Sequence, residues 1–306
     1  MSAEIALNLL LDRYSGDLTL VDIGARWGAH HRWAPLAGRS TIIGFEPDAE
    51  ECVRLNADCP PHISYLPIGL ANEEGERDLY ITREPACSSN HAPIETLYKN
   101  YAGLDCTILE RVVRIACRRL DDVLQERNVG PVAAMKLDTQ GSELSILKGS
   151  VETLKACSLI DIEVEFNPIY AGQGLFCDVD RWLRDNGFVL WRLENLEHYA
   201  PEAIEMAQTA FVVGAPPALS HAAPVSNGQV FWAQTQYVRA DYPQTGAAHM
   251  AFDDAIGPAI LCGVYGFWDL AIELIRKTGE RELLQNLRMA CGLAPAPAEG
   301  AGLQIA

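Results

Sequence analysis

Two short apolar runs near the start of the chain each lead to an acidic residue. Residues 18–22 end at Asp22, and residues 41–45 are followed by Glu46. Apolar runs of this length are typical of strands in a parallel sheet that is covered on both faces. Ligands of such sheets bind beyond the carboxyl ends of the strands. The pattern therefore predicts an α/β fold with a ligand site near these two acids.

The rest of the chain continues the alternation of strands and helices. Further strands are expected at residues 63–67, 77–82, 112–117, 131–137, 159–166, 188–193 and 230–239, the last two as an antiparallel edge. Helices are expected at residues 1–13, 48–57, 121–126, 139–148 and 179–186. From about Gly246 the apolar spacing becomes helical, which predicts two or three helices. We therefore expect one domain over residues 1–242 and a helical extension over 243–306.

The turn after the first strand carries glycines at two positions, Gly24 and Gly28. Glycine lets the backbone approach a ligand closely because it has no Cβ. A dinucleotide site needs G-x-G-x-x-G beside a helix N-terminus, whereas this turn has D-x-G-x-x-x-G. Asp22 suits a cationic ligand, and Glu46 is placed to accept hydrogen bonds from ribose hydroxyls. The pattern favours S-adenosylmethionine over a dinucleotide, and an ordinary turn whose glycines serve packing stays open as an alternative.

Composition narrows the functional classes. Hydrophobic residues make up 49% of the 306 residues and charged residues 21%, as in folded globular proteins. The net charge of −17 disfavours nucleic acid and anionic membranes as partners. We expect neither a signal peptide nor a membrane span, because the first residues lack a basic segment and no run of about 18 apolar residues occurs. The nine cysteines form no C-x-x-C pair, which indicates free thiols in a reducing cytoplasm.

The most specific motifs lie in the middle of the chain. They are R-L-D-D at 119–122, M-K-L-D-T-Q-G-S-E-L-S-I-L-K-G at 135–149, V-D-I-G-A at 21–25, G-F-E-P at 44–47 and S-S at 88–89. From Val21 to Arg239 the chain resembles the FkbM-type family of class I S-adenosylmethionine-dependent methyltransferases. The resemblance implies a Rossmann-like, seven-stranded, mostly parallel sheet and methyl transfer to a hydroxyl of a sugar, glycan or secondary metabolite. Gln140 departs from the family pattern, in which Glu is commoner.

The candidate donor-binding residues follow the predicted strands. Asp22, Gly24, Gly28 and Glu46 belong to the first two strand ends, and Asp138 ends the strand at 131–137. After the strand at 63–67, three residues are placed by position to line the adenine of S-adenosylmethionine: Gly69, Leu70 and Asn72. The product of the reaction would be S-adenosylhomocysteine.

The candidate catalytic residues are those that could remove a proton from the acceptor. They are Asp138, Glu165, His30 and His31, with His91 as a further histidine. Each histidine also has a plain reading as a surface or packing residue. Asp138, Glu163 and Glu165 could hold Mg²⁺ through oxygens, but no ligand spacing favours a metal. The loop at 83–91 is a candidate lid.

Four functional readings stay open at this point. The first is O-methylation of a small molecule or glycan, and the second is N- or C-methylation on the same fold. The third is a non-catalytic donor-binding module that acts through its helical extension, and the fourth is a dinucleotide oxidoreductase. The helices of the extension could pair with a second copy or pack as a cap on their own core, since Tyr265, Phe267 and other apolar residues at 263–268 would form a buried or sticky surface. Of the two, we expect the homodimer.

Overall fold

The computed structural model of the protein describes residues 3–201, 228–244 and 249–294. The chain forms two compact units, each of which is considered by itself. The first unit falls within residues 1–18, 31–41 and 239–306, and the second within residues 19–30 and 42–238. Among the described residues, no helix is both long enough and apolar enough to cross a membrane.

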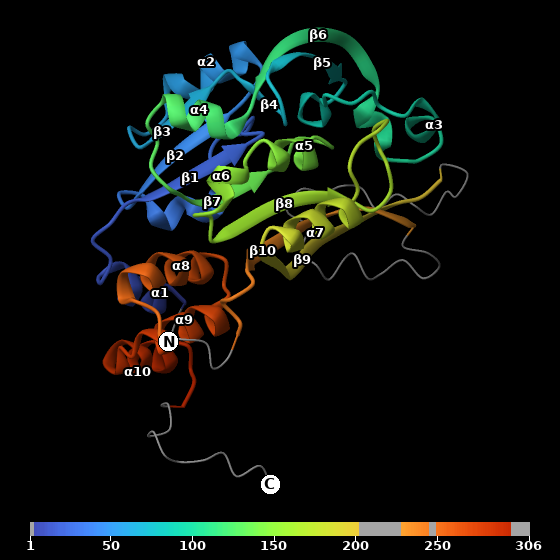
Figure 1. The fold of residues 1–306 in the computed structure, drawn as a ribbon. Coiled ribbons are helices and arrows are strands. Elements are labelled where there is room, and N and C mark those ends of the chain that lie inside the picture. Colours follow the sequence, from blue (N-terminus) through green and yellow to red (C-terminus); the bar gives the residue numbers. More distant parts are fainter. Residues whose placement is uncertain (1–2, 202–227, 245–248, 295–306) are drawn as a thin grey trace. The chain divides into compact units, whose positions relative to one another are not determined.

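A seven-stranded sheet forms the centre of the fold (Figure 1). Its strands, in spatial order, are β3 (Ile63–Leu66), β2 (Ser40–Phe45), β1 (Leu18–Ile23), β7 (Val132–Leu137), β8 (Leu159–Glu165), β10 (Gln229–Arg239) and β9 (Phe188–Tyr199). β2 runs parallel to β3, and β7 runs parallel to both β1 and β8, whereas β10 is antiparallel to β8. The predicted mostly parallel sheet with an antiparallel edge is confirmed.

Helices cover both faces of this sheet in the second unit. They are α2 (Ala49–Ala57), α3 (Glu95–Tyr98), α4 (Leu120–Glu126), α5 (Glu143–Lys148), α6 (Val151–Leu154) and α7 (Phe176–Asp185), with short 3₁₀ turns η2 (Pro85–Cys87) and η3 (Leu104–Thr107). Tyr65 and Leu66 are consecutive on β3 and therefore point to opposite faces. Leu66 joins the core beneath α4, α5, α6 and α7, and Tyr65 packs against Cys52 of α2.

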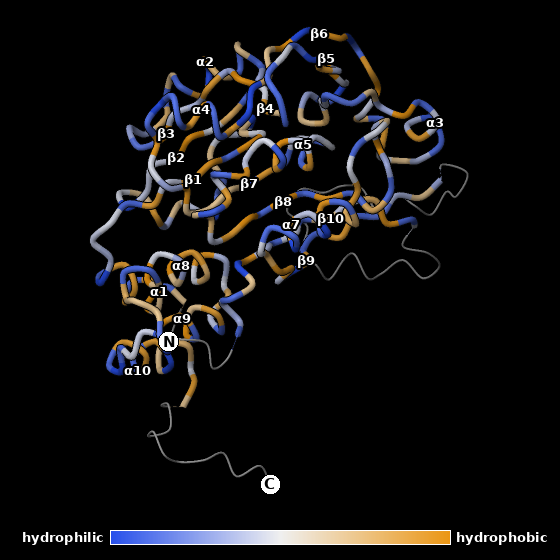
Figure 2. The backbone as a smooth tube through the Cα atoms, in the orientation of Figure 1, coloured by the Kyte–Doolittle hydropathy of each residue, from blue (hydrophilic) through white to orange (hydrophobic). Residues whose placement is uncertain are grey.

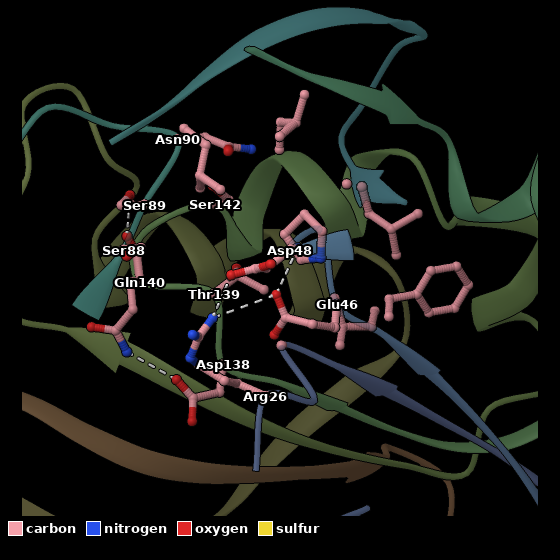
Figure 3. Close-up of a pocket in the computed structure, with 18 of the residues that line it drawn as sticks. Arg26, Glu46, Asp48, Ser88, Ser89, Asn90, Asp138, Thr139, Gln140 and Ser142 are labelled. Atoms are coloured by element: carbon pink, nitrogen blue, oxygen red, sulfur yellow. Dashed lines mark hydrogen bonds and ion pairs between the residues drawn. The ribbon is translucent and has the colours of Figure 1, made fainter. Parts of the chain in front are cut away.

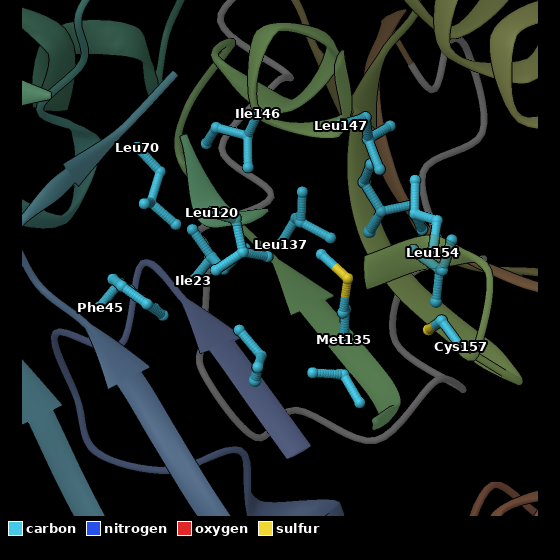
Figure 4. Close-up of a cluster of buried hydrophobic side chains, with 14 of the residues drawn as sticks. Ile23, Phe45, Leu70, Leu120, Met135, Leu137, Ile146, Leu147, Leu154 and Cys157 are labelled. Carbon is cyan, nitrogen blue, oxygen red and sulfur yellow. The ribbon is translucent and has the colours of Figure 1, made fainter. Parts of the chain in front are cut away.

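The larger core lies between the central strands and these helices. Figure 4 shows Ile23, Met135 and Leu137 of the sheet facing Leu120, Ile146 and other helix residues. In Figure 2 the hydrophobic stretches of β1 and β7 lie side by side. These are the continuous apolar runs that predicted buried parallel strands.

A second, three-stranded sheet was not predicted. It consists of β4 (Gly69–Leu70), β6 (Leu109–Arg118) and β5 (Gly75–Thr82), in that order. The strands at 77–82 and 112–117 were expected, but their mixed polar and apolar sequences do not indicate which partner they pair with. β5 and β6 pair antiparallel, so their alternation reflects one covered and one exposed face.

The first unit is helical apart from the ends of three sheet strands. It contains α1 (Ala3–Leu11), the 3₁₀ turn η1 (His31–Leu36), α8 (Phe252–Val264), α9 (Trp268–Thr278) and α10 (Arg281–Ala290). Helix α1 packs against α8 and α10. The domain boundary near residue 242 stays a prediction. Tyr265 and Phe267 are only 2% and 1% exposed, so these two side chains follow the buried alternative and not the sticky one. The homodimer stays a prediction.

Candidate functional site

A pocket opens in the second unit at the carboxyl ends of β1, β2 and β7 (Figure 3). The space between its lining residues, part of which is open to solvent, has a volume of about 830 Å³. The five predicted donor-binding residues that line it are Gly24, Glu46, Gly69, Leu70 and Asp138. The arrangement of β2, β1 and β7 explains why Gly24, Glu46 and Asp138 converge, because parallel strands place their carboxyl ends at one edge of the sheet. Gly69 and Leu70 form β4 of the second sheet.

Gly24 forms the junction between β1 and β7. Its backbone has φ of +80°, and a Cβ at this position would lie 1.9 Å from the carbonyl oxygen of Asp138. The Asp138 N–H in turn donates to the Ile23 carbonyl at 3.0 Å. The close approach of these two backbone segments therefore requires glycine, as in the packing alternative left open for this turn. Gly24 also lines the pocket.

Glu46 lies at the end of β2 and is 4% exposed. Burial raises the pKa of its carboxyl, while the hydrogen bond from the Asp48 N–H to Oε1 at 2.9 Å opposes this rise. Arg26 Nη1 lies 3.4 Å from Asp48 Oδ2 and 3.9 Å from Glu46 Oε1. Asp48 also caps α2 by accepting from two backbone N–H groups. A capped helix thus fixes the acid at the pocket wall.

Apolar side chains form the wall beside Glu46. They come from β2, from the segment after β3, from β5 and β6 and from α5: Phe45, Ile68, Leu70, Leu79, Ile81, Ile115 and Ile146. Trp27 also lines the pocket although 76% of it is exposed. An acid next to an apolar slot can hold a ring system that carries hydroxyl groups on one side. Sequence reasoning found Leu70 of β4 here but missed the contributions of β5 and β6.

Lys136 links two acids below the pocket. Its Nζ lies 3.5 Å from Asp22 Oδ1 and 3.5 Å from Asp138 Oδ2, and it donates to the Gly24 carbonyl at 3.1 Å. Burial alone would lower the pKa of Lys136, but the carboxylates of Asp138, Asp22 and Glu163 outweigh it and raise the pKa. The side chain of Asp138 is 35% exposed and that of Asp22 only 1%. Of the two acids that contact Lys136, Asp138 is thus the one that faces the pocket.

Asp22 does not line the pocket. Its Oδ2 accepts a hydrogen bond from the His30 N–H at 2.7 Å. This bond attaches the loop of residues 24–30 to the buried Asp22 side chain. Burial raises the pKa of Asp22, against the opposing effects of Lys136 and His30. Gly28, with φ of +97°, lies in the same loop and also outside the pocket lining. Direct contacts from Asp22 and Gly28 to a donor stay predictions.

The candidate histidines lie away from the pocket lining. His30 Nε2 is 3.2 Å from Asp161 Oδ2 on β8, and two glutamine amides, Gln234 and Gln236, donate to Asp161 Oδ1. Burial alone would raise the pKa of Asp161, but His30 and the two amides lower it. This contact anchors His30 to the sheet. His31 begins η1 and belongs to the first unit, so its role as a base stays a prediction.

Asn72 and His91 border a different hollow. The Asn72 N–H and Oδ1 both bond to Ser145 Oγ, at 3.2 and 3.1 Å. The His91 Nδ1 lies 3.1 Å from the Ala171 carbonyl, and burial lowers the pKa of this imidazole. The hollow is also lined by Lys148. The structure therefore does not bring Asn72 into the pocket with Gly69 and Leu70.

The acids of β8 lie behind Asp138. Glu163 and Glu165 are 8% and 2% exposed, and burial together with neighbouring carboxylates raises both pKa values well above their usual range. Gln140 Nε2 donates to Asp138 Oδ1 at 2.9 Å and to Glu163 Oε1 at 2.7 Å. Glu165 does not line the pocket. In the part of the chain that the structure describes, no three His, Cys, Asp or Glu side chains form a metal-ligand group.

The loop of residues 85–90 forms another part of the pocket lining. Ser88, Ser89 and Asn90 line the pocket, and Ser89 pairs with Tyr80 through both backbone groups. The Ser89 hydroxyl donates to the Gln140 carbonyl at 2.6 Å. The loop is therefore tied both to the second sheet and to the turn after β7. Its role as a moving lid stays a prediction.

Comparison with known proteins decides the family. A sequence model described as the Methyltransferase FkbM domain matches residues 22–190, which is more than half of the chain. The chain belongs to the FkbM methyltransferase family. This match contains the strand-end acids Asp22, Glu46 and Asp138 and both glycines of the first turn, and the methyltransferase assignment follows from it.

Individual relatives of this FkbM methyltransferase are distant. The hexuronic acid methyltransferase AglP of Haloferax volcanii is 23% identical over 199 residues, which cover 62% of this chain and 76% of AglP. The crystal structure of magnesium protoporphyrin IX methyltransferase from Synechocystis aligns with a TM-score of 0.34 and 11% identity, covering 77% of this chain and 76% of that one. An rRNA methylase from Streptococcus thermophilus aligns with a TM-score of 0.31 and 12% identity, covering 77% and 94%.

Proposed function

We propose that this FkbM methyltransferase binds S-adenosylmethionine in the pocket and methylates a hydroxyl group of a sugar, glycan or secondary metabolite. The observation that carries the proposal is the buried acid Glu46 next to the apolar wall, at the carboxyl end of β2. An acid at this place of a doubly wound sheet accepts the hydroxyl hydrogens of a ribose. The family match supplies the reaction type.

The pocket residues fit the parts of S-adenosylmethionine. Glu46 would hold the ribose, the wall of Leu70, Ile68 and their neighbours would enclose the adenine, and Asp138 would face the cationic methionine end. When bound, this group supplies a methyl carbon activated by a sulfonium. Lys136 and Gln140 hold Asp138 at the pocket floor, since each contacts one of its carboxylate oxygens.

Asp138 is the best placed proton acceptor for the second substrate. It lines the pocket, whereas Glu165 is buried behind it and His30 is paired with Asp161. The Asp138 carboxylate would accept the proton of the acceptor hydroxyl as that oxygen is methylated. Ser88, Ser89 and Asn90 offer polar groups that orient the acceptor.

The net charge and one relative support the proposed acceptor class. AglP is named as acting on a hexuronic acid, which makes a sugar a reasonable acceptor class here. The net charge of −17 supports a small molecule or glycan over nucleic acid. N-methylation needs an acceptor nitrogen that loses its proton before or during the transfer, and Asp138 could serve there too; the sugar relative is the observation that favours oxygen.

Calorimetric titration of S-adenosylmethionine tests the donor site. Wild-type protein should bind with a micromolar dissociation constant, and Glu46→Ala should bind about 10- to 100-fold more weakly, because a hydrogen bond to a charged acceptor contributes about 1.5–3 kcal/mol. Glu50→Ala is the matched control, since Glu50 is exposed on α2. Failure of the wild type to bind, with NAD⁺ titrated alongside, would overturn the proposal.

A further inference from the structure

Gln140 occupies an unusual place between the pocket and the buried acids. It follows Asp138 and Thr139 at the end of β7, and its φ of +59° lies in the left-handed region although it is not glycine. Such conformations cost free energy and persist only where the surroundings hold them. The Ser89 hydroxyl, 2.6 Å from the Gln140 carbonyl oxygen, is one such restraint.

The side-chain amide of Gln140 makes three contacts. Its Nε2 donates to Asp138 Oδ1 and to Glu163 Oε1, and its Oε1 accepts from the Tyr170 hydroxyl at 3.2 Å. The orientation of the amide is assigned from these contacts, in which its nitrogen donates to two carboxyl oxygens and its oxygen faces a hydroxyl that can donate. The amide thus provides both its hydrogens to acids and its oxygen to the hydroxyl.

Tyr170 connects this amide to the pocket loop. The ring is fully buried, and its hydroxyl shares its single hydrogen between the Cys87 carbonyl at 2.7 Å, just before Ser88 and Ser89, and the more distant Gln140 Oε1 at 3.2 Å. The loop of residues 87–89 therefore reaches Gln140 twice, through the Ser89 hydroxyl to the backbone and through Tyr170 to the amide. A displacement of this loop would be transmitted to Asp138.

Lys136 and Gln140 act on different oxygens of Asp138. Lys136 is 3.5 Å from Oδ2 and carries the charge that opposes the acids, while Gln140 is 2.9 Å from Oδ1 and carries none. The Gln140 amide lies between Asp138 and Glu163, and among the described residues no cation lies within ion-pair distance of Glu163. An uncharged hydrogen-bond donor therefore suits the position of Gln140. A glutamate in place of Gln140 would lose one or both of the hydrogen-bond donors and would lie between two other acids.

We propose that Gln140 is a positioning residue that holds the Asp138 carboxylate at the pocket floor and couples it to the loop of residues 87–89 through Tyr170. The inference rests on the proposed function, in which Asp138 faces the donor and the acceptor. It assigns to Gln140 a requirement for an uncharged hydrogen-bond donor, which a purely space-filling role would not have.

The test compares two replacements of similar size. Gln140→Glu exchanges the amide for an acid, and Gln140→Met keeps the volume without any hydrogen bond. The titratable groups that surround the site are Lys136, Asp138, Glu143, Glu163, Glu165, Tyr170 and Cys87. With so many acids nearby, the introduced carboxyl should stay protonated, and able to donate, to well above its usual pKa.

S-adenosylmethionine is then titrated into each variant from about pH 6 to about pH 9. Relative to wild type at the same pH, Gln140→Glu should bind within about threefold at the acidic end and at least about tenfold more weakly at the basic end. Gln140→Met should show a loss of about tenfold at every pH, and Tyr170→Phe a loss of about threefold. A Gln140→Glu loss that does not change with pH, or wild-type affinity in Gln140→Met, would overturn the proposal.

Two controls keep the outcome decisive. Gln125→Glu adds the same charge at an exposed position of α4 and should leave binding unchanged. If wild type binds no S-adenosylmethionine at any pH, the proposed function fails. The thermal unfolding of the ligand-free variants then tests by itself whether Gln140 holds Asp138 through its hydrogen bonds. The midpoint of Gln140→Glu should then fall further below wild type as the pH rises, while the deficit of Gln140→Met stays constant; equal pH dependence in both would overturn it.

Discussion

The two sides of the pocket are built in different ways. At the end of β2, a single buried acid, Glu46, stands beside an apolar wall, and its support is local: Asp48 two residues later and the helix that Asp48 caps. At the ends of β7 and β8, Asp138 belongs to a network of acids that share one lysine and one amide. The first side is suited to recognition of a fixed shape, and the second to groups whose charge and position must be controlled during a reaction.

The junction of β1 and β7 gives the largest expected effect, because both sides depend on it. Gly24→Ala places a Cβ 1.9 Å from the Asp138 carbonyl oxygen at a φ of +80°. We expect a loss of about 3–5 kcal/mol in the free energy of unfolding, from strain and separation of the two strand ends. Urea denaturation measures it.

Gly28→Ala is the matched control for this glycine. Its φ is +97°, but the nearest atom to an added Cβ is the Tyr65 hydroxyl oxygen at 3.7 Å. Only the backbone conformation is then strained, so a loss of about 1 kcal/mol is expected. If Gly24→Ala costs no more than Gly28→Ala, the close approach of β1 and β7 does not explain the glycine.

The acid network predicts a stability that depends on pH. Glu165 is 2% exposed, and burial and the charges of Glu143 and Asp138 raise its pKa well above its usual value. Below its unfolded pKa the carboxyl is protonated in both states. Above it, the unfolded chain releases the proton more readily than the folded chain, so this group lowers stability as the pH rises toward its folded pKa. Glu165→Gln should therefore gain about 1–3 kcal/mol of stability at about pH 8 and little at about pH 4.

Thermal unfolding over this pH range tests the expectation for Glu165. The exposed Glu50 of α2 provides the contrast, since Glu50→Gln removes a carboxyl that is not buried and should leave the pH profile unchanged. If the stability of Glu165→Gln depended on pH in the same way as that of wild type, the buried acids of β8 would not destabilise this side of the pocket.

The smallest expected effect concerns the adenine end. Asn72 is exposed and bonds to Ser145 outside the pocket, so Asn72→Ala should change the dissociation constant of S-adenosylmethionine by less than about twofold. Ile68 lines the pocket wall, and Ile68→Ala should weaken binding about tenfold through lost apolar contact. Calorimetry on both variants compares them directly. A larger loss from Asn72→Ala would restore the positional prediction from the sequence.

The sequence predicted best what depends on near neighbours. Apolar runs that end in acids located β1, β2 and β7 and placed Glu46 and Asp138 at their ends, because strand length and strand-end polarity are written in consecutive residues. The position of Leu70 followed from the same reasoning. Asn72, only two residues further, lies outside the pocket because the chain has already left β4 for the next turn.

Contacts between distant segments were not predictable in this way. His30 was a candidate base, yet it lies 3.2 Å from the buried Asp161 on a strand more than a hundred residues later, and no local pattern indicates this pair. The pairing of β4, β5 and β6 in a separate sheet, and the amide contacts of Gln140, depend likewise on tertiary packing. Only the departure of Gln140 from the family pattern drew attention to it.

The bond between Lys136 and the Gly24 carbonyl has a consequence for synthesis of the protein. The two residues are 112 positions apart in the chain, so the glycine turn leaves the ribosome long before the lysine that holds it. Contacts that close such long loops form late, and in a nascent chain that ends before β7 only one edge of β1, the edge beside β2, has its partner strand. The pocket is therefore complete only after β7 has been added. Under the proposed function, a chain cut short before residue 132 should not bind S-adenosylmethionine.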